Sequence, residues 1–347
     1  MAKRVKSPRG GKLAAALQQA AHDTRARALV ASALAAGGAI ATAKLVRDRL
    51  LERRRRRRSP RYRLQPGESP RAGIGRVARG QLDLAIGLLE DGHNGAGDDA
   101  IHEARKALKR LRAALRVSRG FLGTERYRHE NTIVRDAGRA LSDARDAQVL
   151  VTTLDELAEP HADEPDVSGW PRLREALEAS AERDGAAPAP VVEALSDARA
   201  RVSGWPLPQK GGPQALAPGL ERVYRRGRRA FHVAEHEPST EHLHELRKRA
   251  KDLWYAAQLL KPTAPKRMKK VARRAHRLSD VLGKDHDLAV LLERAEGEPE
   301  LLAPTELEAL REVIARQREQ LQREAMARAS RLYKRKPRKL ARLVAAS

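Results

Sequence analysis

The chain has 347 residues, a formal net charge of +25 and no cysteine. The lack of cysteine excludes disulfides, thiolate metal sites and a cysteine nucleophile, and the large positive charge indicates a polyanionic partner such as nucleic acid, an anionic membrane or another polyphosphate. Aromatic residues make up only 3% of the chain, and Ala, Leu, Arg and Glu dominate. This composition, without any run of alternating β-branched residues, predicts an all-α fold.

Residues 1–67 are predicted to form a basic N-terminal extension, partly disordered and partly helical, that ends in a linker. Residues 28–43 carry no charge, but a membrane span needs about 20 apolar residues and this stretch is shorter and contains two glycines. A weak surface helix is therefore favoured, and membrane contact is left open. The run from Arg53 to Arg58 is expected to make weak contact with nucleic acid or anionic lipid. The Pro and Gly content of residues 61–70 predicts the linker.

Residues 68–347 are predicted to fold as one domain made of two repeats, about 69–205 and 214–347. The first repeat begins with a helix that Ser69 caps, with Pro70 at its first position. Its core residues are expected to be Ile74, Leu82, Ile86 and Leu89. The helices that follow are a basic helix capped by Asp98 or Asp99 and ended by Gly120 to Gly123, then helices over residues 125–158, 172–182 and 191–202.

The second repeat is predicted to restate the first. A helix over residues 219–231 is followed by a second basic helix over 243–260, capped at Ser239. A long helix over residues 265–294 and a final helix from Pro304, ending in the basic stretch 331–342, complete the repeat. The segment VSGWP occurs twice and places Trp170 and Trp205 as packing anchors at helix ends.

The segment from Ile101 to Val117 predicts a helix with one basic and one apolar face. At 100° per residue, Leu108 and Leu111 fall on the side that packs against a core. The basic side is made of His102, Arg105, Lys106, Lys109, Arg112 and Arg116. Such a face is often simply solvated, so the pattern alone leaves its function open.

A second copy of this pattern occupies residues 243–260. Its basic side is made of His244, Arg247, Lys248 and Lys251. Each of these lies 142 residues after its counterpart in the first copy, since 244 − 102 = 142. Three long helices and a fourth element in each repeat match the plan of a four-helix bundle, so the sequence predicts two pseudo-symmetric four-helix bundles.

Both basic helices, IHEARKALKRLRAALR and LHELRKRAKDLWYAAQLL, are followed some forty residues later by an LSD…RD or LSD…HD element. These four elements, in this order, resemble the CHAD family, the conserved-histidine α-helical domain, from about residue 68 to the C-terminus. The resemblance implies a pair of four-helix bundles related by a pseudo-twofold axis. It also implies binding of inorganic polyphosphate in a basic channel between the halves, in the cytoplasm and often at polyphosphate granules.

Some members of that family carry an N-terminal triphosphate-processing domain, and no such domain fits before residue 68. We therefore expect a non-enzymatic binder with no catalytic residue, cofactor or metal. Arginine suits phosphate because its planar fork donates two parallel hydrogen bonds. The expected binding residues are the two basic faces described above, then Arg76, Arg79, Arg222, Arg226 and Arg229 on the first helix of each half, and Lys334 and Lys339 near the end.

Several alternatives remain open at this level. His102 and His244 could simply cap or pack, and Asp143, Asp146, Asp280 and Asp287 are expected to form ion pairs that orient the cations. As metal ligands these histidines and aspartates lack an HExxH motif. One alternative function is a nucleic-acid-binding or granule-associated architectural protein. Another is a metal-dependent phosphohydrolase. The oligomeric state and the preferred polyphosphate length are not encoded in any pattern we recognise.

Overall fold

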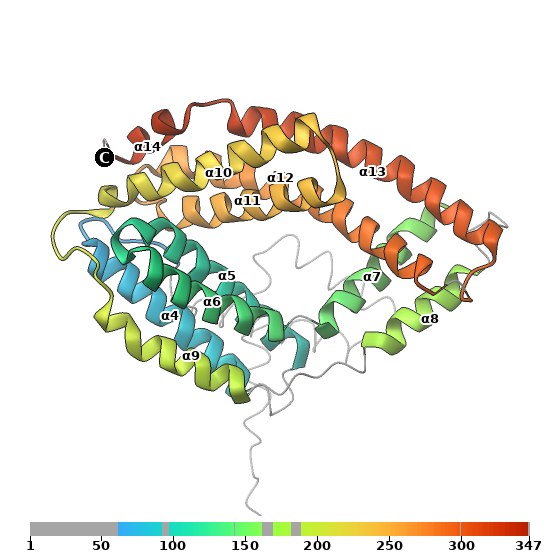
Figure 1. Ribbon diagram of the computed structural model, residues 1–347, viewed down its shortest axis with the longest axis horizontal. Coiled ribbons are helices and arrows are strands. Elements are labelled where there is room, and N and C mark those ends of the chain that lie inside the picture. The colour runs from blue at the N-terminus through green and yellow to red at the C-terminus, as the bar shows by residue number, and fades with distance from the viewer. Residues whose placement is uncertain are drawn as a thin grey trace, which may run out of the picture. The chain divides into compact units, whose positions relative to one another are not determined.

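The computed structural model describes most of the chain after the N-terminal extension. The described residues are 62–91, 97–141, 143–161, 169–181, 189–298 and 300–345. Every regular element in these ranges is a helix, with no strand among them, so the all-α prediction is confirmed (Figure 1). The predictions for residues 1–61, including the uncharged stretch 28–43 and the arginine run, lie outside the described residues. Among the helices that are described, none has the length and apolar content to cross a membrane.

The helices fall into two sequence halves. The first half contains α4 (Pro70–Asp91), α5 (Gly97–Leu122), α6 (Thr124–Ala140), α7 (Asp143–Ala158), α8 (Trp170–Ala181) and α9 (Ala189–Arg201). The second half contains α10 (Ala217–His236), α11 (Thr240–Leu259), α12 (Pro265–Glu296), α13 (Pro304–Tyr333) and α14 (Pro337–Ala345). Short 3-10 helices lie at Glu159–His161, Val202–Gly204 and Pro213–Leu216.

Two predicted N-terminal caps, Ser69 and Ser239, form the expected hydrogen bonds with the first turns of their helices. The Ser69 hydroxyl accepts a hydrogen bond from the Ala72 amide at 3.2 Å, and the Ser239 hydroxyl accepts one from the His242 amide at 3.2 Å. Gly123 separates α5 from α6 with a φ of 78°, a conformation that favours glycine. The predicted cap of the basic helix is wrong by one or two residues. Since α5 already begins at Gly97, Asp98 and Asp99 lie in its first turn.

The predicted single helix over residues 125–158 is wrong, because α6 ends at Ala140 and α7 begins at Asp143. The two pieces pack into different hydrophobic cores. Val134 of α6 lies in the larger core, whereas Leu154 of α7 lies in a second, smaller one. A break in the helix lets each piece present its apolar face to its own core. The equivalent helix of the second half, α12, is unbroken and contributes to both cores.

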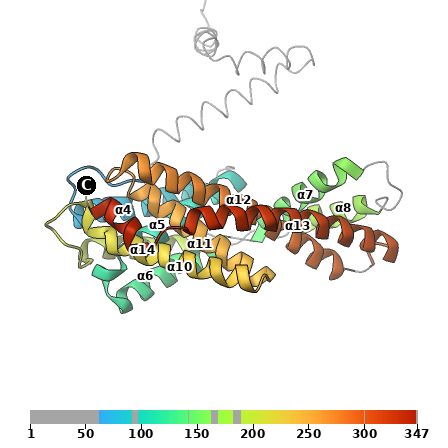
Figure 2. The same cartoon turned by 90° about the horizontal axis from the view of Figure 1, so that it is seen from above.

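The larger core is built mainly from α4, α5, α6, α9, α10, α11 and the first half of α12. The predicted core residues Ile74, Leu82 and Leu89 are buried in it, and Ile86 packs against it. The smaller core joins α7 and α8 to the second half of α12 and the first half of α13. Figure 2 shows α12 and α13 running together toward α7 and α8. The cores therefore do not divide the chain at the boundary between the two predicted repeats.

The tryptophans of the two VSGWP segments are both buried, which confirms their expected packing role. Trp170 lies in the smaller core and Trp205 in the larger one. The linker expected at residues 61–70 is not free of the fold. Leu64 is buried, and its amide donates a hydrogen bond to the Leu259 carbonyl at 3.0 Å. The chain thus docks against the C-terminal end of α11 before α4 begins.

Candidate functional site

The basic helix α5 packs against both α10 and α11. Gly219 of α10 makes this approach possible, because a methyl group on its Cα would overlap the carbonyl oxygen of Val117 in α5. Ala113 and Val117 are buried although they fall on the basic side of the helix. The C-terminal half of the basic face of α5 is therefore not simply solvated, because its cations lie between helices.

The first meeting point of the two basic helices is the carboxylate of Asp252 in α11. An Arg116 guanidinium nitrogen from α5 lies 3.0 Å from Asp252 Oδ1, and these two side chains are only 12% and 13% exposed. Arg249, on α11 itself, lies 2.7 Å from the other carboxylate oxygen. One buried carboxylate therefore bridges arginines from both helices.

Two further arginines surround this bridge. Burial and the positive charge of Arg116 lower the pKa of Arg112 to about 10. Partial burial and the positive charge of Arg249 lower the pKa of Arg226, on α10, in the same way. Arg249 also pairs with Glu245 at 2.7 Å, so four arginines from three helices lie near two carboxylates, which leaves an excess of positive charge at the junction of α5, α10 and α11.

The second meeting point is Lys251 of α11. Burial, followed by the positive charges of Arg247 on α11 and Lys109 on α5, lowers its pKa to about 7. Lys109 and Lys251 occupy equivalent positions in the two sequence copies, so the copies bring matching cations close together. The two basic rows therefore face a common region and do not point into separate patches of solvent.

A pair of histidines lies next to Lys251, between α11 and α12. The rings of His244 and His286 are 4.2 Å apart between centroids. Within the described part of the chain, the Nδ1 atoms of both rings and Nε of Arg247 are buried without a hydrogen-bond partner. Burial, followed by the positive charge of His244, lowers the pKa of His286 to about 4. Burial and Lys248 lower the pKa of His244, so both rings are neutral at neutral pH.

His286 was not expected as a site residue. It directly precedes Asp287 in the LSD…HD element, at the position that Arg145 holds in the first copy. A basic residue type at the same place in both copies was the available signal. Asp287 lies 4.0 Å from Arg247, which agrees with the expected orienting role of this aspartate. Asp280 pairs instead with His276 at 2.6 Å. The side chains of Asp143 and Asp146 lie outside the described residues.

Some predicted residues form ion pairs with acidic residues nearby in the sequence. Lys106 lies 2.6 Å from Glu103, Lys248 lies 2.9 Å from Glu245, and Arg76 lies 2.7 Å from Glu68. His102 and Arg105 are partly buried on α5, and Arg79 is partly buried on α4. Burial and the charge of Arg119 lower the pKa of Arg222. The remaining predicted residues, Arg229 on α10 and Lys334 and Lys339 around α14, are exposed on a different surface.

A strongly basic face of α12 was missed by the sequence analysis. Seven of the twelve residues from Lys266 to Arg277 are Lys or Arg, and all seven are exposed. In the other half, α6 carries four arginines but also three acidic residues. The charge run in the sequence was the available signal. The run ends at Arg277, one helical turn before Asp280, whose charge acts on Lys251 of the site.

Comparison with known proteins adds one finding to this geometry. The model of a family described as the CHAD domain matches residues 76–296, which is more than half of the chain. The match runs from α4 to the end of α12 and so includes every residue of the site at α5, α10, α11 and α12. No curated protein matches the chain. Within the described residues, no group of three or more His, Asp or Glu side chains is arranged to hold a metal ion.

Proposed function

Since the chain belongs to the CHAD domain family, we propose that it binds inorganic polyphosphate at the junction of α5, α10, α11 and α12 and does not convert it. The observation that carries this proposal is the convergence of equivalent cations from the two basic helices, Lys109 and Lys251, on one region. The role of the molecule would then be to hold or target polyphosphate, in the cytoplasm and at polyphosphate granules.

The charge balance of the site supports an anionic ligand. Cations held close together out of water are destabilising unless counter-charges accompany them. Asp252 and Glu245 together neutralise only part of the positive charge of the four arginines near them. Phosphate oxygens would accept charge-assisted hydrogen bonds from the arginine forks. They would also accept from the unpartnered Nε of Arg247.

The dimensions of the helices suit an extended polymer. From residue 102 to residue 116 an α-helix rises about 21 Å, and from residue 266 to residue 277 about 16 Å. A polyphosphate chain that follows α5 and then α12 would therefore contact several cations in sequence. It has no bases to recognise, and the described tryptophans are largely buried or stacked within the fold. The two pseudo-symmetric bundles inferred from the 142-residue repeat belong to the same proposal, as the source of the paired basic helices.

The proposal is tested by titrating the protein with polyphosphate of defined length over a range of salt concentration. If about ten phosphates are contacted at a slope near −0.7 each, affinity falls about 10⁴-fold between 50 and 200 mM salt. Combining Arg105→Glu with Arg247→Glu is expected to leave helicity intact and to remove most of the binding. Unchanged affinity in this double variant would refute the site.

The same protein and polyphosphate samples distinguish the proposed function from two alternative functions. At matched phosphate and salt, long-chain polyphosphate is expected to displace duplex DNA from the protein; the reverse order would favour a nucleic-acid-binding role through the arginine run and the basic face of α12. Incubation of pure protein with polyphosphate and Mg²⁺ or Mn²⁺ tests the phosphohydrolase alternative. Release of phosphate that a site variant abolishes would overturn the non-enzymatic proposal.

A further inference from the structure

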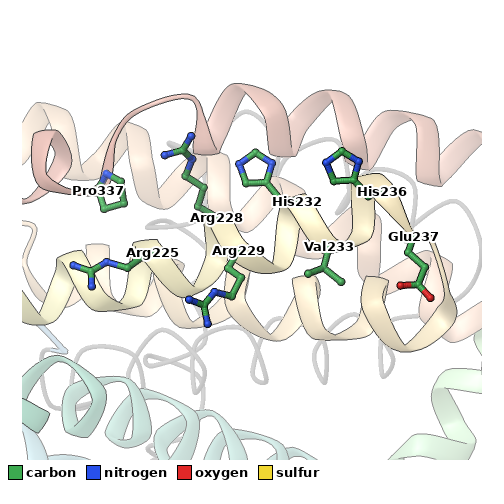
Figure 3. Close-up of a pocket in the computed structure, with 8 residues that line it drawn as sticks. All are labelled: Arg225, Arg228, Arg229, His232, Val233, His236, Glu237 and Pro337. Carbon is green, nitrogen blue, oxygen red and sulfur yellow. The ribbon is translucent and has the colours of Figure 1, made fainter.

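The outer face of α10 carries a second basic surface with its own shape. A shallow hollow of about 570 Å³ is lined there by three arginines, two histidines, one carboxylate and two apolar residues (Figure 3): Arg225, Arg228, Arg229, His232, Val233, His236 and Glu237 at α10, and Pro337 of α14. Figure 3 shows Arg228, His232 and His236 along one edge of the helix, with Arg225 and Arg229 along another. None of the site residues on α5, α11 or α12 lines this hollow.

One edge of the hollow lies on a different side of α10 from the candidate site. Arg226 faces α5 and α11, since the charges that act on it are those of Arg249 and Arg116. At 100° per residue, Arg228 and His232 project about 160° and 120° away from Arg226, whereas Arg229 and Val233, at the other edge of the hollow, project about 60° and 20° away from it. Arg228 lies instead near Tyr224. Burial raises the pKa of the Tyr224 hydroxyl, whereas its hydrogen bond with the Arg335 backbone and the charge of Arg228 lower it. The edge of the hollow that carries Arg228 and His232 therefore projects away from the candidate site.

The C-terminal segment adds charge beside the hollow and is fixed in place. Residues 325–347 contain eight Lys or Arg and no acidic residue. The Tyr224 hydroxyl donates to the Leu332 carbonyl at 3.0 Å and accepts from the Arg335 amide at 3.2 Å. Gly227 leaves room for the Tyr333 ring, which a methyl group at that position would overlap. The connection between α13 and α14 is thus held against α10 with Lys334 and Lys339 exposed.

Little of this charge is neutralised. Arg225 pairs with Glu221, and His232 lies 3.3 Å from Glu235. Among the described residues, no ion pair involves Arg228, Arg229 or the exposed Lys334 and Lys339. An open hollow suits a flexible polymer better than a small molecule, because the binding free energies of many weak phosphate contacts add up along a chain.

We propose that the outer face of α10 and the α13–α14 connection bind a second segment of polyphosphate independently of the first site. One molecule would then hold two chains together. This inference rests on the proposed function, because it names the same ligand class. It goes further in making the molecule a bridge, whose effective affinity for two chains exceeds that of either surface alone.

The test uses full-length protein with all six arginines from Arg53 to Arg58 replaced by glutamine in every sample, so that the extension does not contribute. The hollow variant combines Arg228→Glu with Lys339→Glu, and the site variant combines Arg105→Glu with Arg247→Glu. The control combines Arg316→Glu with Arg323→Glu, both exposed on α13. Each pair changes the net charge equally. The readouts are the number of short polyphosphate chains bound per molecule by calorimetry, and energy transfer between donor-labelled and acceptor-labelled chains.

The parent and control proteins are expected to bind two short chains each and to give energy transfer. The hollow and site variants are each expected to bind one chain and to lose the transfer. A hollow variant that still binds two chains and bridges them overturns the inference, as does a site variant that prefers duplex DNA to polyphosphate at matched phosphate. A parent that binds one chain refutes the bridge and keeps the proposed function. A parent that binds none refutes both.

Discussion

The pKa of Lys251 reflects the burial and the charge of its surroundings. It lies on α11 among Arg247 and Lys109, where burial and these neighbours lower its pKa to about 7. The negative charges of Asp287 and Asp280 raise the pKa of Lys251 again, but only in part. Near neutral pH the free protein therefore holds this lysine close to its midpoint, ready to gain a proton when an anion arrives.

Polyphosphate binding is accordingly expected to take up protons. A bound anion raises the pKa of Lys251 from about 7 toward its ordinary value. Affinity should then be greatest below pH 7 and weaken as the pH rises through and above 7. The pKa values of His244 and His286 are lowered in the free protein. Protonation of these rings at lower pH should therefore strengthen binding further. The measurement is calorimetry from pH 5 to pH 9 in buffers of different ionisation enthalpy.

The matched control for this prediction is Lys251→Arg, which keeps the positive charge but does not titrate in this range. It should flatten the dependence above pH 7 and leave the strengthening of binding at lower pH in place. An unchanged profile above pH 7 would assign the dependence to other groups.

Asp252 is the residue that we expect to hold the arginines of the site in position. Its carboxylate contacts Arg116 at 3.0 Å and Arg249 at 2.7 Å. Asp252→Asn removes the shared counter-charge and is expected to lower the free energy of unfolding by about 3 kcal/mol, because the arginines stay buried without it. Added polyphosphate should restore more stability to this variant than to the wild type, as measured by thermal unfolding.

The comparison variant is Glu319→Gln, which breaks an exposed pair with Arg323 at 2.8 Å. Such pairs contribute about 0 to 1 kcal/mol, so this variant should behave as wild type. Equal stabilisation of wild type and Asp252→Asn by polyphosphate would place the ligand away from this carboxylate.

At the scale of the helix, α12 differs from its counterpart α6 in a way that duplication does not explain. Its first half carries seven exposed cations from Lys266 to Arg277, whereas acidic residues offset most of the charge of α6. Like charges three or four residues apart destabilise a helix. A stretch of this kind is consistent with a ligand that neutralises it. It ends one helical turn before Asp280, whose charge acts on Lys251, so it leads toward the site.

We therefore expect α12 to determine the preference for chain length. Lys266→Glu combined with Arg273→Glu should weaken binding of long chains and reduce their salt slope by about 0.7 for each phosphate that the variant no longer binds. Short chains that occupy only the junction of α5 and α11 should bind as to wild type. The measurement is the affinity of this variant for short and for long polyphosphate, compared with the control that combines Arg316→Glu with Arg323→Glu. Equal weakening for both lengths would contradict it.

For the whole molecule, the packing of α12 ties the candidate site to both hydrophobic cores. Leu278 and Leu282 lie in the larger core, and Leu288 and Leu291 lie in the smaller one. Asp280, Gly283 and Asp287 lie between or beside these residues and face the cations of α11. A long unbroken helix thus sets the position of the site from two sides, whereas the broken α6 and α7 serve one core each.

Much of this protein could be read from the sequence alone. The helices, the caps at Ser69 and Ser239, the break at Gly123 and the two basic faces all follow from patterns within a few residues of each other. Helical periodicity, capping hydrogen bonds and glycine conformation act over that same short range.

Only the tertiary structure decided which charges meet. Arg116 and Asp252 are far apart in the sequence, and so are Lys109 and Lys251, and no local pattern brings either pair together. The break between α6 and α7, the close approach of the His244 and His286 rings and the burial of the C-terminal half of the basic face of α5 also depend on partners from other elements. Packing between distant segments is a property of the assembled chain, and so the shape of the binding site forms only once the helices have assembled.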